Sequence, residues 1–178
     1  MRNTINFFII FFLIACENSE ARLPENLKSD DFIKNSAKKN KKLNNYEYNL
    51  IKNYIELSNK DYRESNYGFW YYKEIKKNNT KNKLRFGDKI YFKFTVKDLE
   101  DKIIYSDYKS KNKIYFMEQE PIISGLREGL KLMHEGEKMT FIFPSQIAYG
   151  FRGDQKKIKP NSPLVYEVII DKIVYNDK

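Results

Sequence analysis

A short helical segment that carries two glycines is the feature that most constrains the fold. Leu126 and Leu130 lie four residues apart on one apolar face, which predicts a short helix that starts near Ser124. A glycine inside a helix costs about 1 kcal/mol relative to alanine. Gly125 and Gly129 therefore indicate a close approach. Either the helix packs tightly on a sheet, or its first turn lies directly beneath a ligand.

Four segments around this helix have the composition of strands. Aromatic and β-branched residues dominate 69–75, 90–96, 138–144 and 164–174, and apolar residues alternate with polar ones in several of them. The prolines, asparagine and serine of 159–163 predict a turn before the last strand. The chain therefore combines several strands with one short internal helix.

Three successive motifs resemble those of the FKBP-type peptidyl-prolyl cis-trans isomerases. The motifs are "PIISGLREG", which opens the short helix, the loop "AYGFRG", and the closing strand "IKPNSPLVYEV". The resemblance covers roughly residues 66–176. It implies an α+β fold in which a curved antiparallel sheet wraps around a short helix, preceded here by an N-terminal helical extension. It also implies a peptidyl-prolyl cis-trans isomerase whose partners are proline-containing unfolded or exported proteins.

The family motifs assign roles to individual residues of this chain. The resemblance implies that the Tyr149 hydroxyl bonds a substrate carbonyl, that Tyr105 forms a wall, and that Leu126 forms the floor beneath the proline ring. These are the three expected catalytic residues. The other positions expected to contact substrate are Phe94, Ser106, Asp107, Ile122, Ile123, Ile158 and Tyr166.

The chain departs from the family pattern in two places. Where the family usually has Phe-Asp, this chain has Tyr105-Ser106 with Asp107 one place later. The usual acid is therefore either replaced by a hydroxyl or displaced by one residue. Lys113 and Lys157 stand where apolar rim residues are common. The alternative to an active isomerase is a catalytically weak FKBP-like chaperone or binding module within a cell-envelope assembly.

The first sixteen residues have the pattern of a lipoprotein signal peptide. A short basic start precedes an apolar run that is too short to span a bilayer, and Leu13-Ile14-Ala15-Cys16 resembles a bacterial lipobox. We expect Cys16, the only cysteine in the chain, to be lipidated and to anchor the protein to a lipid bilayer. The expected location is the cell envelope, facing the periplasm or the exterior. The "GFWYY" opening also resembles a lipoprotein branch of the family associated with gliding motility.

Residues 17–65 are expected to form a tether and a helical extension, and 66–178 the isomerase domain. Apolar residues recur at helical spacing at Tyr46, Leu50, Tyr54 and Leu57, flanked by Ile51 and Ile55, after a run rich in lysine and asparagine. Because the family motifs begin only after Tyr67, we expect this helix to be dispensable for the pocket. Its apolar stripe would then dock on a partner or on a second copy of the chain.

The charge of the chain suggests no specific ligand. The formal net charge is +9, but the lysines are mixed with asparagine, isoleucine and tyrosine along the whole of the 178 residues, as an AT-rich genome would produce. No recognisable nucleic-acid motif accompanies them, so nucleic acid is not an expected partner. The sequence shows no metal-ligand cluster and no phosphate-binding loop. We expect neither metal nor cofactor, since prolyl isomerisation requires neither.

Overall fold

The computed structural model describes residues 29–75, 83–107 and 112–176. Its elements, in chain order, are α2 (Ser29–Leu57), β1 (Arg63–Glu64), β2 (Trp70–Ile75), β3 (Lys89–Lys97), β4 (Ile103–Ser106), β5 (Lys113–Phe116), α3 (Ser124–Leu130), β6 (Lys138–Phe143), the 3-10 turns η2 (Ser145–Ile147) and η3 (Gly150–Arg152), and β7 (Leu164–Val174). The chain divides into two compact units, residues 1–39 and 40–178. In the first unit, residues 29–39 are helical, and Phe32 and Ile33 are exposed.

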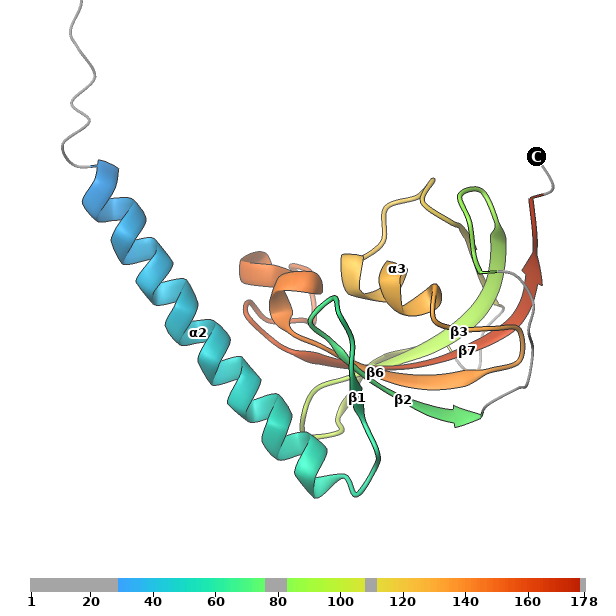
Figure 1. The fold of residues 1–178 in the computed structure, drawn as a ribbon, viewed down its shortest axis with the longest axis horizontal. Helices are drawn as coiled ribbons and strands as arrows, with labels where there is room; N and C mark the ends of the chain where they lie inside the picture. Colours follow the sequence, from blue (N-terminus) through green and yellow to red (C-terminus); the bar gives the residue numbers. More distant parts are fainter. Residues whose placement is uncertain (1–28, 76–82, 108–111, 177–178) are drawn as a thin grey trace, which may run out of the picture. The chain divides into compact units, whose positions relative to one another are not determined.

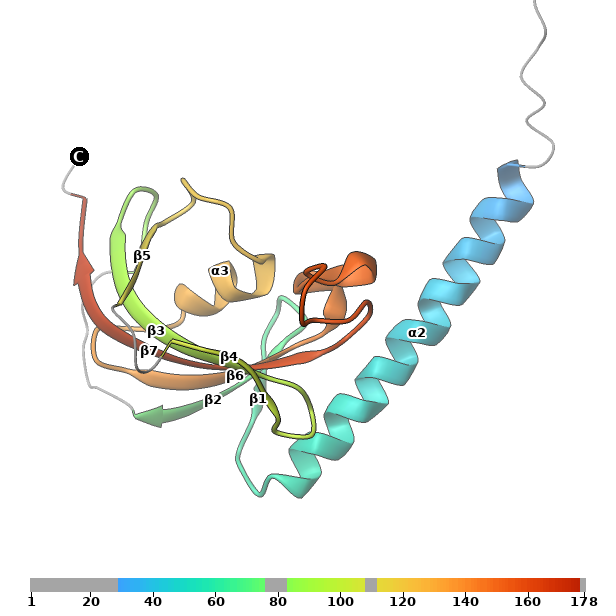
Figure 2. The same ribbon diagram turned by 180° about the vertical axis from the view of Figure 1, so that it is seen from behind.

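The second unit is built on one antiparallel sheet. Its strand order is β1-β2-β6-β7-β3-β4. Both β4 and β5 pair with β3, β5 with the first half of β3 and β4 with its end. The long strands β3 and β7 form the centre, where Phe94 lies opposite Val168, and β6 aligns Phe141 with Tyr166. The sheet is strongly curved, and α3 lies across its concave face (Figures 1 and 2). The expected α+β fold, a curved sheet around a short helix, is confirmed.

The two glycines of α3 face aromatic rings of β6. A Cβ atom on Gly125 would lie 2.6 Å from Cδ1 of Phe143, and one on Gly129 would lie 3.0 Å from Cε1 of Phe141. Both rings are fully buried, so they have little room to move away. The glycines therefore allow the helix to pack closely on the sheet, which is the first of the two explanations that the sequence offered for them.

The second half of α2 packs on the opposite face of the sheet. Ile51 is fully buried there, and Glu47 is only 2% exposed. The Glu47 carboxylate accepts hydrogen bonds from the Ser145 backbone N–H at 2.9 Å and from the Ser145 hydroxyl at 2.6 Å. The small apolar cluster on this face consists of Ile51, Trp70, Ile142 and Val165. Residues 40–57 thus belong to the same compact unit as the sheet, whereas the sequence predicts a boundary at residue 66.

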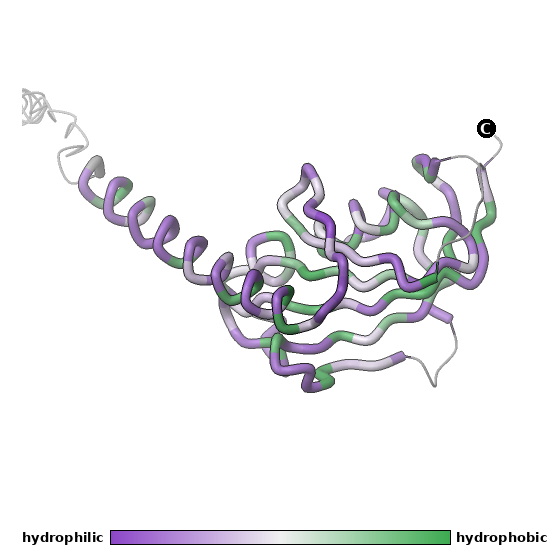
Figure 3. Tube along the Cα trace, turned by 60° about the horizontal axis from the view of Figure 1, so that its bottom comes forward, coloured by the Kyte–Doolittle hydropathy of each residue, from purple (hydrophilic) through white to green (hydrophobic). Residues whose placement is uncertain are grey.

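The helical extension is confirmed, but its buried face differs from the predicted stripe. Tyr46 is 62% exposed and Leu57 is 84% exposed, whereas the neighbouring Glu47 and Ile51 are buried. The buried face of the helix is shifted by one residue from the predicted stripe. It includes Glu47, which hydropathy places in solvent but which accepts two hydrogen bonds from Ser145. Ile51 and Glu47 pack on the domain, and the docking of the exposed stripe residues on a partner or a second copy stays a prediction. Figure 3 shows that hydrophilic residues cover most of the helix.

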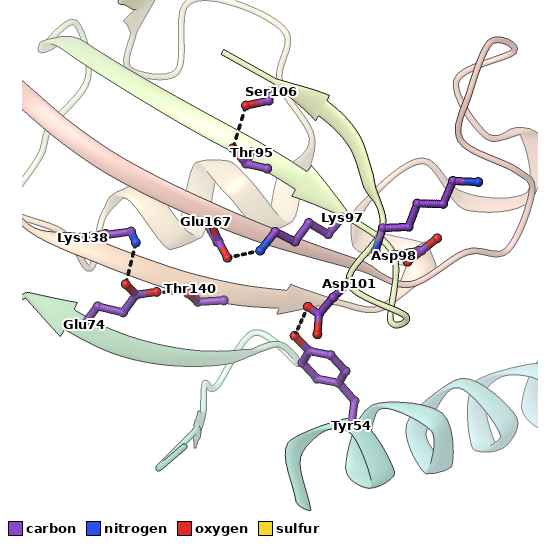
Figure 4. A network of polar contacts seen from close by, with 11 residues as sticks. Tyr54, Glu74, Thr95, Lys97, Asp98, Asp101, Ser106, Lys138, Thr140 and Glu167 are labelled. Atoms are coloured by element: carbon purple, nitrogen blue, oxygen red, sulfur yellow. Dashed lines mark hydrogen bonds and ion pairs between the residues drawn. The ribbon is translucent and has the colours of Figure 1, made fainter. Parts of the chain in front are cut away.

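The outer face of the sheet also carries polar pairs. Lys138 Nζ lies 2.6 Å from the Glu74 carboxylate, which also accepts a hydrogen bond from the Thr140 hydroxyl at 2.7 Å (Figure 4). Lys97 pairs with Glu167 on the neighbouring strands. Within the described part of the chain, no helix is both long and apolar enough to cross a membrane.

Candidate functional site

A pocket of about 520 Å³ opens between the start of α3, the central strands and the loop after β6. Residues of β3, β5, β7, α3 with the segment before it, and the loop between η2 and η3 converge on it, and most of the side chains that line it are apolar or aromatic. The lining residues are Phe94, Lys113, Pro121, Ile122, Ile123, Ser124, Leu126, Ala148, Tyr149 and Tyr166. Six of the ten residues expected to form the site therefore meet here.

Two aromatic rings form a wall of this pocket. Phe94 of β3 and Tyr166 of β7 are stacked, with ring centroids 5.9 Å apart and an interplanar angle of 23°. The Tyr166 ring also packs on Phe143 at 5.4 Å, and Phe94 stacks on Phe92 at 5.9 Å. Such contacts hold each ring from behind, so the wall is rigid rather than adaptable.

The start of α3 forms the floor and one rim. Leu126 points from the first turn of the helix and is only 3% exposed, while Ile122 and Ile123 are half-buried in the segment that leads into it. The Ser124 hydroxyl donates a hydrogen bond of 3.3 Å to the Ile147 carbonyl. This bond ties the helix start to the loop that carries Tyr149.

Tyr149 contributes the phenol of the pocket. It lies half-buried between the 3-10 turns η2 and η3, next to the buried ring of Tyr166. Burial, together with hydrogen bonding to Tyr149, raises the pKa of Tyr166 far above its usual range. Tyr166 therefore stays protonated and acts as a neutral polar group. The side chains that line the pocket are apolar, aromatic or hydroxyl-bearing, apart from the ammonium of Lys113.

Tyr105 lies beside this pocket and is held by Asp154. The Tyr105 hydroxyl donates a short hydrogen bond to the Asp154 carboxylate, and this bond raises the pKa of Tyr105. The other Asp154 oxygen accepts backbone N–H bonds from Lys156 at 2.9 Å and Ile158 at 2.7 Å. Burial alone raises the pKa of Asp154, but these hydrogen bonds outweigh it and hold the pKa below its usual range. Tyr105 of β4 is thereby fastened to the loop after η3.

Comparison with known proteins identifies the family. A model of the FKBP-type peptidyl-prolyl cis-trans isomerases matches residues 80–171. The chain belongs to this family. The FKBP resemblance that the three sequence motifs carry is thus confirmed, and with it the classification as an FKBP-type isomerase.

Individual FKBP-type proteins show how far the similarity extends. The chain is 36% identical over 93 residues to the peptidyl-prolyl cis-trans isomerase FKBP2 of Homo sapiens, which covers 51% of this chain and 65% of that protein. It is 44% identical over 52 residues to the probable isomerase FkpA of Neisseria meningitidis, covering 29% of this chain and 19% of that protein. These matches span less than two thirds of the relatives' length. A crystal structure of a peptidyl-prolyl cis-trans isomerase from Pseudomonas syringae pv. tomato shares the fold, with a TM-score of 0.61, 20% identity, and coverage of 76% of this chain and 96% of that one.

The FKBP family usually has an acid directly after the aromatic wall residue, here Tyr105. Neither Ser106 nor Asp107 takes the place of that acid in the pocket. Ser106 lies on the outer face of the sheet, where its Oγ is 3.1 Å from Oγ1 of Thr95 (Figure 4). Thr95 and Phe94 are consecutive in β3 and so point to opposite faces. The Asp107 backbone N–H donates to the Phe94 carbonyl at 2.9 Å. Neither residue lines the pocket, and the carboxylate that contacts Tyr105 comes from Asp154 instead.

Ile158 does not line the pocket either. It is 3% exposed and contributes to the core and to a second cavity of about 380 Å³. That cavity is lined by residues of the β3–β4 turn, of β4, of the loop before β7 and of the start of β7, and no aromatic ring is among them, whereas Phe94, Tyr149 and Tyr166 line the pocket at Leu126. We therefore take the pocket at Leu126 as the functional one.

The rim carries two lysines above aromatic rings. Lys113 Nζ lies 5.3 Å from the ring centroid of Phe94, and Lys157 Nζ lies 5.2 Å from that of Tyr105. Both lysines are exposed, and only Lys113 lines the pocket itself. The family resemblance implies that both lysines stand at positions where apolar rim residues are common.

Sequence reasoning gave no role to four residues of the site. Pro121, Ser124 and Ala148 line the pocket, and all three belong to the quoted motifs. Asp154 was also missed, although an aspartate directly after a glycine in a turn is typical of a side chain that accepts nearby backbone N–H bonds. Among the described residues, no three His, Cys, Asp or Glu side chains are grouped to hold a metal ion.

Proposed function

We propose that the protein is an active peptidyl-prolyl cis-trans isomerase that acts on proline-containing segments of other proteins. The observation that supports this is the pocket at Leu126, where a rigid aromatic wall, an apolar floor and one phenol meet. Its volume of about 520 Å³ exceeds what one proline ring needs and leaves space for the flanking peptide. A pocket with these properties suits a neutral ring better than a charged or metal-bound substrate.

The chemistry of this reaction requires no nucleophile. Amide conjugation produces a barrier of about 18 to 20 kcal/mol, which slows uncatalysed X-Pro rotation to tens or hundreds of seconds. The twisted transition state has lost this conjugation and much of the amide dipole. An apolar pocket disfavours the planar, more polar ground state relative to the twisted one. In this protein the rings of Phe94 and Tyr166 and the side chain of Leu126 supply that environment.

The Tyr149 hydroxyl supplies the directional contact in this proposal. Tyr149 lines the same pocket as Ile122 and Ile123, so a peptide bound in the pocket would lie within reach of its hydroxyl. A hydrogen bond from this phenol to a substrate carbonyl holds one side of the X-Pro bond while the other rotates. One such bond contributes about 1 kcal/mol, which corresponds to a several-fold effect on rate.

A protease-coupled assay tests the proposed activity. The full chain is mixed with short peptides that differ only in the residue before proline, and the protease cleaves the trans form alone. We expect an increase in the cis-to-trans rate that is proportional to protein concentration. If no peptide is accelerated while unfolded proteins are still protected from aggregation, the chain is a binding module rather than an isomerase.

We further propose that the protein is a lipid-anchored component of the cell envelope whose clients are exported proteins. The support is the tetrapeptide Leu13-Ile14-Ala15-Cys16, which lies outside the described residues. Each buried methylene of an acyl chain contributes about 0.8 kcal/mol, and stable anchoring takes more than one chain. Cys16→Ser should release the protein from salt-washed membranes. Retention of the processed variant on those membranes would refute the anchor.

A further inference from the structure

We propose that the pocket prefers proline segments in which an acidic residue is adjacent to the proline. This inference rests on the proposed isomerase function and adds the class of substrate. It follows from the position of Lys113 and Lys157, the two cations of the rim. Phe94, the aromatic neighbour of Lys113, belongs to the wall of the pocket, and Tyr105, the aromatic neighbour of Lys157, lies beside the pocket.

Lys113 is the more important of the two cations because it lines the pocket directly. It lies on β5, opposite Phe92 of β3, and its ammonium is 5.3 Å from the centre of the Phe94 ring. Attraction between a cation and an aromatic face favours this location for the ammonium over free solvent. In residues 29–75, 83–107 and 112–176, no carboxylate lies within ion-pair distance of Lys113.

Lys157 adds a second positive charge on the side of Tyr105. Its ammonium lies 5.2 Å from the centre of that ring. The nearby carboxylate of Asp154 is already occupied by the Tyr105 hydroxyl and by backbone N–H groups of Lys156 and Ile158. Those hydrogen bonds hold Asp154 in place beneath the loop, and Lys157 makes no ion pair within the described part of the chain.

Two acidic residues just before the pocket segment, Glu118 and Glu120, do not remove this bias. Glu118 is paired with Lys131 at 2.6 Å. Glu120 is exposed and precedes the pocket segment at Pro121 without lining the pocket. An incoming glutamate or aspartate side chain next to proline would therefore meet the Lys113 ammonium over the Phe94 ring, with the Lys157 ammonium beside the pocket.

The expected preference is small because both lysines are exposed. Charge pairs on a protein surface contribute only modestly, which corresponds to a two- to five-fold change in an equilibrium or rate. Salt weakens them, because the screening length falls from about 30 Å at 0.01 M salt to about 3 Å at 1 M. We expect Glu-Pro peptides to be processed about three-fold faster than Gln-Pro peptides of the same sequence at low salt. Glutamine matches glutamate in size, so the ratio isolates charge.

The experiment measures kcat/KM for the Glu-Pro and Gln-Pro peptides with the full chain, at low and at high salt. Lys113→Gln should reduce the ratio towards one, Lys113→Glu should invert it, and Lys157→Gln should have a smaller effect than Lys113→Gln. Lys172→Gln is the control, since Lys172 is exposed on β7 and does not line the pocket. Binding of both peptides, each carrying a fluorescent label, is measured by anisotropy with the same variants.

The outcomes separate this inference from the proposed function. A ratio near one in the unsubstituted protein, or a preference that survives in Lys113→Gln/Lys157→Gln, overturns the inference even if both peptides are isomerised. If neither peptide is isomerised, the proposed activity fails, and the anisotropy ratio alone decides the preference for acidic segments. A preference that Lys172→Gln removes as effectively as Lys113→Gln would show only a long-range effect of net charge and would also overturn it.

Discussion

Replacement of Glu47 by alanine should destabilise the domain strongly, although this residue lies on the N-terminal helix. Its carboxylate accepts two hydrogen bonds from Ser145, at 2.9 and 2.6 Å, and both residues are almost completely buried. A hydrogen bond to a charged group contributes about 1.5 to 3 kcal/mol, but the buried charge itself carries a desolvation cost. We expect Glu47→Ala to lower the free energy of unfolding by about 3 kcal/mol, because the Ser145 N–H loses its partner.

Urea denaturation of the full chain measures this loss. Glu56→Ala is the matched control, because Glu56 is exposed on the same helix and its replacement should change stability by less than about 0.5 kcal/mol. If Glu47→Ala does not fold, Glu47→Gln keeps the side-chain volume and one acceptor and should lose about 1 kcal/mol. Equal effects of Glu47→Ala and Glu56→Ala would show that the helix does not pack on the sheet.

Four further substitutions test other parts of the structure. Gly125→Ala should lower the melting temperature, because the new Cβ would lie 2.6 Å from the Phe143 ring and overpacking costs about 1 to 3 kcal/mol; an unchanged melting temperature would refute the close packing. Burial raises the pKa of Glu74, but hydrogen bonds from its lysine and threonine neighbours outweigh burial and lower the pKa. Its contribution to the free energy of unfolding is therefore present above the ordinary glutamate pKa and is lost as pH falls. The stability difference between the protein and Glu74→Gln should shrink between about pH 6 and about pH 3, and a constant difference would contradict this sign. Asp154→Ala and Tyr105→Phe should each reduce kcat/KM by a few-fold, and the double variant should be no worse than either single one; additive losses would show that the two residues act independently.

Local patterns predicted the sheet and the short helix well. The predicted strand at 164–174 coincides with β7, and the predicted helix start at Ser124 coincides with that of α3. These segments could be predicted because their side chains alternate or recur with the period of the element that buries them. The short strands β4 and β5 were not predicted, since four residues are too few for a period to show.

Long-range partners account for what the sequence did not show. Glu47 and Ser145 are 98 residues apart, and Tyr105 and Asp154 are 49 apart, so no local pattern links them. The predicted stripe on α2 was turned by one position because one of its buried residues is charged. At the pocket, family motifs located Leu126 and its neighbours, whereas the acid beside Tyr105 comes from a different loop. These groups meet only in the folded chain, so the hydropathy of the sequence does not reveal that they are partners.

The most direct test of the account is the rate of proline isomerisation measured without a protease, by NMR exchange between the cis and trans signals of one peptide. The account predicts that the protein accelerates exchange, that Tyr149→Phe lowers this acceleration several-fold, and that Leu126→Asp abolishes it because a charge must be desolvated beneath the proline ring. Circular dichroism of each variant establishes that it is folded. Acceleration by folded Leu126→Asp equal to that of the unsubstituted protein would contradict the central claim that this pocket performs the isomerisation.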